Sequence, residues 1–236
     1  MPGSLRREYG NCDYDVRDNL SAFGVWQLPF RSRRPLVQRV CGGWQYSETL
    51  FFHTGLPFSV LSAPYTANGH GIFQAAGPEF ASRVPGVPVY RKSSIAGVTL
   101  PGTIQWLNPD ALLSAVDPST GACYAGDSAA NCQFGTSRRN QFRGPRFTYS
   151  DIYLTKTIPL REGVTFRFDT QLFNALNHPN FALPTDVQAG IPGKPSTQTG
   201  FGDLTSTISP PTGLLGVGLG GDSSPRMIAF QGRIEF

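Results

Sequence analysis

Polar side chains, most of them charged, recur at alternate positions in three segments of this sequence, and they are the residues best placed to do chemistry. Guanidinium groups suit carboxylates or phosphates, and ionised carboxylates accept hydrogen bonds. Such a set can line a path for a polar solute. Equally, its members can pair with each other across neighbouring strands, each pair contributing about 0.2–1 kcal/mol. The set consists of Asp151, Tyr153, Arg167, Asp169, Gln171 and Arg233.

No other pattern indicates catalysis, a metal or a cofactor. Serine, histidine and aspartate occur without a GxSxG elbow or a paired-carboxylate motif. His53, His70 and His178 have no acidic or cysteine neighbours at ligand spacing. The glycine-rich run 213–223 resembles a phosphate loop, but a proline and a strand pattern follow it instead of a helix. We therefore expect no enzyme activity and no cofactor.

The charge and the cysteines further narrow the class of protein to which this sequence can belong. The net charge is +4, and the 17 arginines are scattered along the chain without any nucleic-acid-binding signature, so no nucleic-acid partner is expected. Cys123 and Cys132 lie in a polar stretch, where they form either a disulfide closing a small loop or two free thiols. Cys12 and Cys41 are expected to be unpaired.

Alternation of apolar and polar residues with a period of two predicts five strands. The clearest case is the C-terminal RMIAFQGRIEF, in which Ile228, Phe230 and Ile234 fall on one face. No long amphipathic helix competes with these segments. The other four predicted strands are 19–30, 43–60 with an interruption near Gly55 and Pro57, 147–158, and 164–175.

The third and fourth strands form a predicted antiparallel hairpin. With 159–163 as the turn, Ile158 lies opposite Val164 and Lys156 lies opposite Phe166. One face is then apolar except for Lys156, which is near the turn, where a long side chain can reach water. The other face is polar, and it carries most of the candidate site residues.

Connection lengths indicate which environment the apolar face meets. The link 159–163 is short and the link 31–42 is moderate, whereas the stretches 61–146 and 176–225 are long and rich in Gly, Pro, Ser and Thr. Short periplasmic turns and long extracellular loops are typical of outer-membrane barrels, whose strands cross the bilayer with about 9–11 residues. We predict an all-β fold of antiparallel up-and-down strands with long outer loops, part of a transmembrane outer-membrane β-barrel.

In this interpretation Phe166, Phe168, Phe230 and Ile234 face lipid, and Phe236 lies at the periplasmic rim. The polar face, with the candidate residues above, lines the lumen. The alternative is a secreted, loop-rich β-sandwich that binds carbohydrate or adheres to surfaces. In the sandwich the same apolar side chains would be sealed under a second layer.

The stretch RRNQFRGPRFTYSDIYLTKTIPLREGVTFRFDTQLFNALNHPNFALP, residues 138–184, resembles the segment that closes the barrel of Oar-like TonB-dependent receptors. RGP and NHPNF are its most specific motifs, and the likeness extends from Tyr9 to Phe236. The resemblance implies a transporter in the bacterial outer membrane. It also implies that the terminal aromatic Phe236 is the signal that the barrel-assembly machinery reads.

The chain also departs from that family. Family members are far longer, with a signal peptide, a plug and about 22 strands, whereas residues 1–236 contain no plug and about five to seven predicted strands. Five strands would leave two unpaired edges in lipid. We therefore expect a C-terminal fragment that does not transport alone, and whose missing N-terminal barrel and plug would contact TonB.

The bilayer and lipopolysaccharide are the expected surroundings. Arg138, Arg139, Arg143 and Arg146, just before the third strand, either hold lipopolysaccharide phosphates or form a solvated loop base. The arginines of the 31–42 turn are expected to be solvated.

Overall fold

The computed structural model describes residues 9–62, 80–91, 93–94, 96, 99–114, 135–184, 188–189, 200–208 and 225–236. The chain folds as two compact units. One, here called the sheet unit, comprises Arg17–Thr54, Arg146–Asn180 and Thr207–Phe236. The other, here called the core unit, comprises Met1–Val16, Gly55–Pro145 and Phe181–Ser206.

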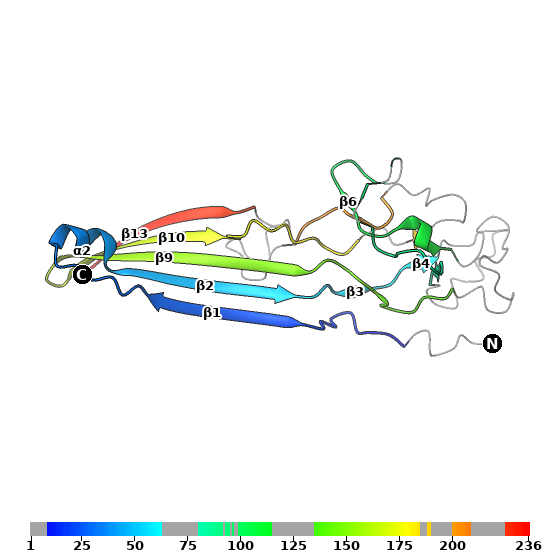
Figure 1. Cartoon of the computed structure of the whole chain (residues 1–236), viewed down its shortest axis with the longest axis horizontal. Coiled ribbons are helices and arrows are strands. Elements are labelled where there is room, and N and C mark those ends of the chain that lie inside the picture. Colours follow the sequence, from blue (N-terminus) through cyan, green and yellow to red (C-terminus); the bar gives the residue numbers. More distant parts are fainter. Residues whose placement is uncertain are drawn as a thin grey trace. The chain divides into compact units, whose positions relative to one another are not determined.

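The sheet unit contains one antiparallel sheet of five long strands (Figure 1). Their order in the sheet is also their order along the chain, so the strands run up and down as predicted. The strands are β1 (Asn19–Gln27), β2 (Trp44–His53), β9 (Phe147–Arg161), β10 (Val164–Phe173) and β13 (Met227–Glu235).

These bounds agree with the five predicted segments. The predicted break near Gly55 and Pro57 separates β2 from the next strand, because β2 ends at His53. At Gly55 the chain passes so close to the carbonyl oxygen of Gly144 that a Cβ atom would collide with it. A glycine is therefore required where the chain leaves the sheet unit.

The register of the β9–β10 hairpin differs from the prediction by two residues. Ile158 pairs with Phe166, not Val164, because the turn contracts to Glu162 and Gly163. Gly163 has a φ of +73°, which a tight turn of this kind requires. A bulge between Val164 and Thr165 accommodates the extra residue of β9. Since the shift is an even number, every side chain keeps its predicted face.

A short helix, α2 (Pro35–Cys41), lies in the connection between β1 and β2 and was not predicted. Proline in its first turn suits a helix start, but its N-cap residue Arg34 makes no side-chain cap. The helix ends with a hydrogen bond of 2.8 Å from the Gly42 N–H to the Gln38 carbonyl. Figure 1 shows α2 at the same end of the sheet as the C-terminus.

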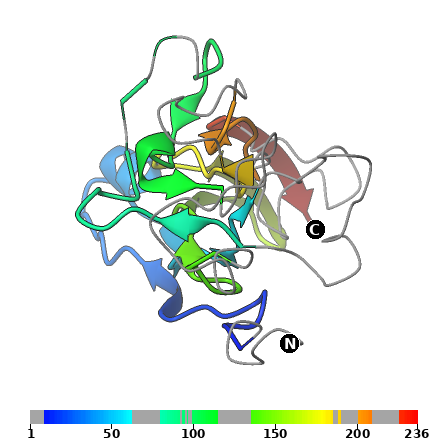
Figure 2. The ribbon, with the colours of Figure 1, turned by 90° about the vertical axis from the view of Figure 1, so that its right-hand side faces the viewer.

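The core unit has a different architecture (Figure 2). Antiparallel pairs form between β3 and β8, β5 and β7, and β6 and β12, and a parallel pair forms between β4 and β11. The elements are β3 (Pro57–Phe58), β4 (Leu61–Ser62), β5 (Ser82–Arg83), β6 (Ile104–Gln105), the 3-10 turn η2 (Pro109–Ala111), β7 (Leu112–Leu113), β8 (Phe142–Arg143), β11 (Gln188–Ala189) and β12 (Asp203–Leu204).

Apolar side chains gather in one buried cluster within the core unit. Val60, Leu107, Leu112 and Phe201 have no exposed surface, and Phe58 and Phe142 are buried beside them. The long stretches 61–146 and 176–225, predicted as outer loops, therefore contain short strands and part of a hydrophobic core in their described portions.

No helix in the described ranges is long and apolar enough to span a membrane. Cys12 and Cys41 are free, as predicted, and both are exposed. Cys123 and Cys132 lie outside the described residues, so their predicted disulfide stays a prediction.

Candidate lumen face of the sheet

The candidate site lies on the polar face of the five-stranded sheet, over a hollow of about 460 Å³. Strands β1, β2, β9, β10 and β13 each contribute side chains to it. Five of the six predicted residues line this hollow: Tyr153, Arg167, Asp169, Gln171 and Arg233.

Two arginines face each other across the β10–β13 pair, because Arg167 and Arg233 are direct register partners. The Arg167 Nε lies 3.0 Å from both carboxylate oxygens of Asp169. The Arg233 Nε lies 2.9 Å from Glu235 Oε1. Each cation is therefore neutralised by the carboxylate two residues further along its own strand, which permits the two guanidiniums to stand side by side.

Asp169 is held from a second side as well. The Thr155 hydroxyl donates a hydrogen bond of 2.5 Å to its Oδ1 from the adjacent strand β9. Asp169 is buried, whereas the Arg167 side chain remains 39% exposed. The geometry fixes the carboxylate and leaves the guanidinium open to the hollow.

Asp151, the sixth predicted residue, lies in the first third of β9, is buried and does not line the hollow. Its Oδ1 accepts a hydrogen bond of 3.0 Å from the backbone N–H of Asn174, the residue that follows β10. In the structure Asp151 therefore fastens the end of β10 to β9.

Three alternating polar residues of β2 that line the hollow were missed by the sequence reasoning: Gln45, Ser47 and Thr49. The alternation in WQYSET was the available signal. Extending the hairpin register to β2 would have placed its polar residues beside β9, where Gln45 pairs with Thr155 and Ser47 with Tyr153.

Strand β1 breaks the polar pattern on this face. Phe23 and Val25 line the hollow and are 88% and 67% exposed. Their neighbours Leu20 and Trp26 lie on the opposite face. Strand β1 is therefore apolar on both sides, which the alternation in the other strands does not predict.

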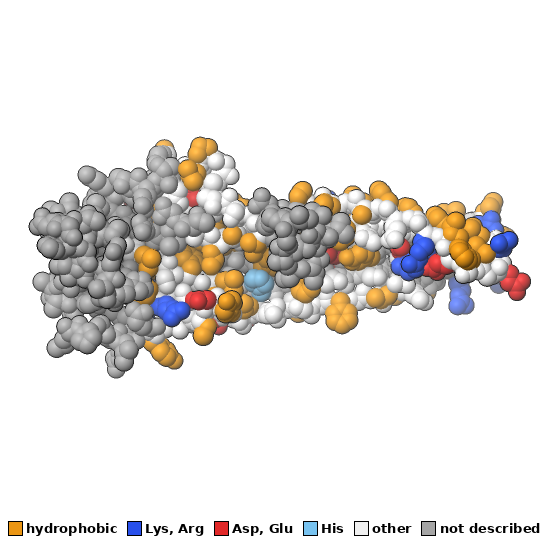
Figure 3. All heavy atoms as spheres, turned by 180° about the vertical axis from the view of Figure 1, so that it is seen from behind, with side chains coloured by type: hydrophobic (Ala, Val, Ile, Leu, Met, Phe, Trp, Pro, Cys, Tyr) orange, Lys and Arg blue, Asp and Glu red, His pale blue; other side chains and the backbone are white. Residues whose placement is uncertain are grey.

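The opposite face of the sheet is apolar and open. Phe230 is 68% exposed and Ile234 57%. Exposed hydrophobic side chains also appear at intervals among polar ones in the view from behind (Figure 3). The Phe168 and Phe230 rings stack at 6.0 Å. None of the aromatic residues predicted to face lipid is buried in a protein interior, so this face has the exposure that contact with lipid requires.

Two ionisable residues interrupt the apolar face, and both have polar partners. Glu48 accepts hydrogen bonds from the Tyr46 hydroxyl at 2.6 Å and from the Ser150 hydroxyl at 3.1 Å. Lys156 is buried and donates to the backbone carbonyls of Val40 and Gly42 at the end of α2. Lys156 therefore does not reach water as predicted, because the helix covers it.

The motif residues mostly fix the backbone. In RGP and the residues before it, Arg143 pairs with Asp15, and Asn140 donates to the Asp13 carboxylate at 2.6 Å. In NHPNF, the Asn180 side chain exchanges two hydrogen bonds with the backbone of Thr148, at 2.8 and 2.9 Å. The Asn180 side chain thus makes the two hydrogen bonds to Thr148 that the backbone of a neighbouring strand would otherwise make.

An antiparallel sheet with an exposed apolar face, a polar face and strands of 9–15 residues is the architecture of a membrane β-barrel wall. The comparison with protein families agrees. The model of the outer membrane beta barrel domain matches residues 2–215, and the chain belongs to this family. No curated protein and no solved structure matches the chain.

The chain is therefore an outer-membrane β-barrel protein located in the bacterial outer membrane. This assignment and the exposed apolar face favour the barrel prediction over the secreted sandwich. Phe236, the terminal aromatic, is fully exposed just beyond β13.

Proposed function

We propose that the chain is part of the barrel of a TonB-dependent, Oar-like transporter, and that its polar sheet face lines the path of a bulky solute. The observation that carries the proposal is the hollow shared by all five strands, in which an open guanidinium lies among amides and hydroxyls. Paired carboxylates prevent a strong excess of positive charge there. Such a surface suits a solute with hydroxyl and carboxylate groups.

The receptor class is supported by the RGP and NHPNF resemblance and by the family of outer-membrane barrels to which the chain belongs. Proteins of this family are typically not enzymes, and the described residues include no cluster of metal ligands. Transport is therefore the activity we assign to the complete receptor, with solute recognition in the lumen.

The five-stranded sheet has two free edges in the described part of the chain, at β1 and β13. Because unpaired strand edges are not stable in hydrocarbon, we propose that further barrel strands pair with them in the functional receptor. A plug that contacts TonB would complete it. This chain alone would then not transport.

Partners of other residues follow from the same proposal. Phe236 would be read by the barrel-assembly machinery. Lipopolysaccharide contact is proposed for Arg138, Arg139 and Arg146, which are exposed. Arg143 is excluded, because its guanidinium is held by the Asp15 carboxylate and by the carbonyls of Asp15 and Gly55.

Thiol labelling of living cells tests the assignment of the two faces. In a variant without other cysteines, Gln171→Cys is expected to react with a membrane-impermeant reagent, whereas Leu172→Cys is expected to resist it. The two positions are adjacent in β10 and differ only in face. Equal labelling, or labelling of position 172 alone, would contradict a lumen on the polar side.

Purification from the native outer membrane tests the receptor class. We expect the chain to be recovered together with plug-bearing sequence, continuous with it or bound to it, and solute uptake to cease when TonB is inactivated. A chain that is recovered alone and conducts ions in planar bilayers without a plug would instead be a channel-forming protein.

A further inference from the structure

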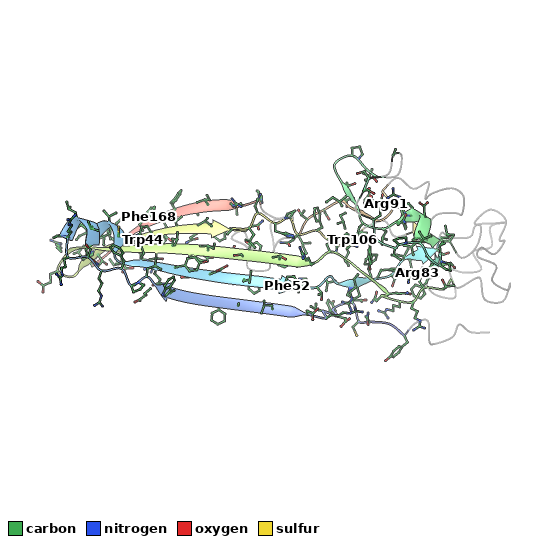
Figure 4. The ribbon with its side chains drawn as sticks, viewed as in Figure 1. Trp44, Phe52, Arg83, Arg91, Trp106 and Phe168 are labelled. Atoms are coloured by element: carbon green, nitrogen blue, oxygen red, sulfur yellow. The ribbon has the colours of Figure 1, made fainter. Side chains whose placement is uncertain are left out.

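The helix α2 covers the apolar face of the sheet at the end where the strands make their short connections. Trp44 and Lys156 belong to that face, and both bind the end of the helix. The Trp44 Nε1 donates to the Val40 carbonyl at 3.0 Å, and the Lys156 Nζ donates to the same oxygen at 3.1 Å. The Lys156 Nζ also lies 5.3 Å from the Trp44 ring centroid. Figure 4 shows Trp44 beside α2.

The side of α2 turned away from the sheet is apolar. Leu36 is 78% exposed and Val40 68%. Leu160, in the hairpin at the same end of the sheet, is also exposed. A seven-residue helix that leaves these side chains uncovered would gain little from forming in water. Contact with hydrocarbon would give its apolar side a favourable environment.

Arginines surround this apolar patch. Arg31, Arg33, Arg34, Arg39 and Arg161 are all exposed, and none of them forms an ion pair with a described carboxylate. Charged side chains gather at this end of the sheet (Figure 3). Guanidinium groups bind phosphate oxygens in a bidentate manner, so the patch is complementary to a layer of phosphate headgroups above hydrocarbon.

We propose that α2 and these arginines, here called the basic helix patch, dock on anionic phospholipids of the periplasmic leaflet. Leu36 and Val40 enter the hydrocarbon boundary, and the arginines hold the phosphates. Lys156 does not contact lipid. It satisfies the carbonyls at the negative end of the helix, which would otherwise be costly next to hydrocarbon. The inference needs only the membrane location and the short-turn end at the periplasm, and is independent of the solute.

Cys41, exposed at the end of α2, permits a direct test. The receptor purified with the strands that complete the barrel, carrying Cys12→Ser, Cys123→Ser and Cys132→Ser, is labelled at Cys41 with a fluorophore. It is then reconstituted into vesicles that contain spin-labelled phosphatidylglycerol, phosphatidylcholine or lipopolysaccharide. The control carries Cys41→Ser and Thr157→Cys, because Thr157 is exposed at the same end of the sheet but on the polar face.

We expect phosphatidylglycerol to quench the Cys41 label at least twofold more than phosphatidylcholine at the same mole fraction, and the control label to be quenched weakly. Replacing Arg33, Arg34 and Arg39 by Gln should remove the preference. Replacing Leu36 and Val40 by Asn should reduce quenching to that of the control while the barrel remains folded by unheated gel migration.

Three results would overturn the proposal. Quenching of the Cys41 label no stronger than in the control would show that the helix does not meet lipid. Equal quenching by the two phospholipids would remove the role of the arginines. Preferential quenching by lipopolysaccharide would place the short connections at the outer surface.

Discussion

The two units of this chain differ in how far their apolar side chains are exposed. In the core unit, Phe201 and Leu107 have no exposed surface and pack in one cluster. In the sheet unit, Phe230 and Ile228 are more than half exposed, although they belong to regular strands. The core unit is thus built for water, since it buries its own apolar surface. The sheet unit is built for a solvent that is itself apolar.

The difference also appears in what each unit uses to hold its backbone. In the sheet unit, long antiparallel ladders satisfy the backbone, as a membrane requires. In the core unit the strands have two residues each. Buried side chains there form hydrogen bonds with further backbone groups. Gln105, for example, is fully buried and donates to the carbonyls of Leu107 and Phe201 at 2.8 and 2.6 Å.

The largest effect that separates the units is expected for a phenylalanine truncation. Phe201→Ala should destabilise the core unit by about 3–5 kcal/mol, because it leaves a cavity in a closed core. Phe230→Ala, the matched change in the sheet unit, should leave the core unit unchanged. Trp106, which packs against the core, reports urea unfolding by fluorescence once Trp26 and Trp44 are replaced by Phe. Equal changes in the free energy of unfolding for the two variants would mean that the two units do not unfold separately.

A charge placed on each face of β13 should be the next largest contrast. Phe230→Arg should cost about 2–4 kcal/mol in a bilayer if the position lies near the midplane, and less near an interface. Gln231→Arg, one residue along and on the polar face, should cost little. Folding titrations of the receptor with its completing strands into lipid vesicles measure both values. A larger cost at position 231 would reverse the assignment of the faces.

A smaller effect is expected from the lysine that interrupts the apolar face. Lys156→Met should cost about 1–3 kcal/mol, because it removes the donor to the carbonyls of Val40 and Gly42. Amide hydrogen exchange in α2 should accelerate. Arg161→Met is the control, since Arg161 is exposed in the same hairpin. Unchanged exchange in α2 for the Lys156 variant would show that the helix does not depend on this contact.

The smallest effect concerns a pH response in the core unit. The Asn140 side-chain amide, with Arg139 nearby, holds the pKa of the Asp13 carboxyl below its ordinary value. Its contribution to stability is therefore present above the unfolded pKa and is lost as the pH falls through the lower folded value. Titration of the carboxyl carbon by NMR should show the lowered midpoint. Asn140→Ala should raise it, and an unchanged midpoint would exclude the amide as the cause.

Strands and faces were predictable because each depends on a local, period-two pattern. The segment 164–175 corresponds to β10 almost residue for residue. The hairpin register was predicted two residues out, since the turn at Glu162 and Gly163 and the accompanying bulge leave no signal in the alternation. An error of two residues does not move side chains between faces, so the candidate lumen residues kept their side of the sheet.

Helix α2, the core unit and the position of Asp151 were not predictable in this way. Seven residues with no side-chain cap do not form a stable helix alone. Helix α2 forms with contacts from Trp44, which follows it closely, and from Lys156, which is distant in the sequence. The core cluster joins residues from Phe58 to Phe201, whose separation gives no periodic signal. Asp151 follows the alternation, but its carboxylate accepts a hydrogen bond from the backbone N–H of Asn174, just after β10.

By itself, the sequence determined the alternating strands, the two faces of the sheet and the asymmetry between short and long connections. These follow from the geometry of one extended chain and the polarity of successive side chains. Only the tertiary structure decided which polar residues meet in one hollow, which of them are used to fasten strand ends, and that a short helix covers the lysine of the apolar face. Each of those outcomes depends on residues far apart in the chain that come together only on folding.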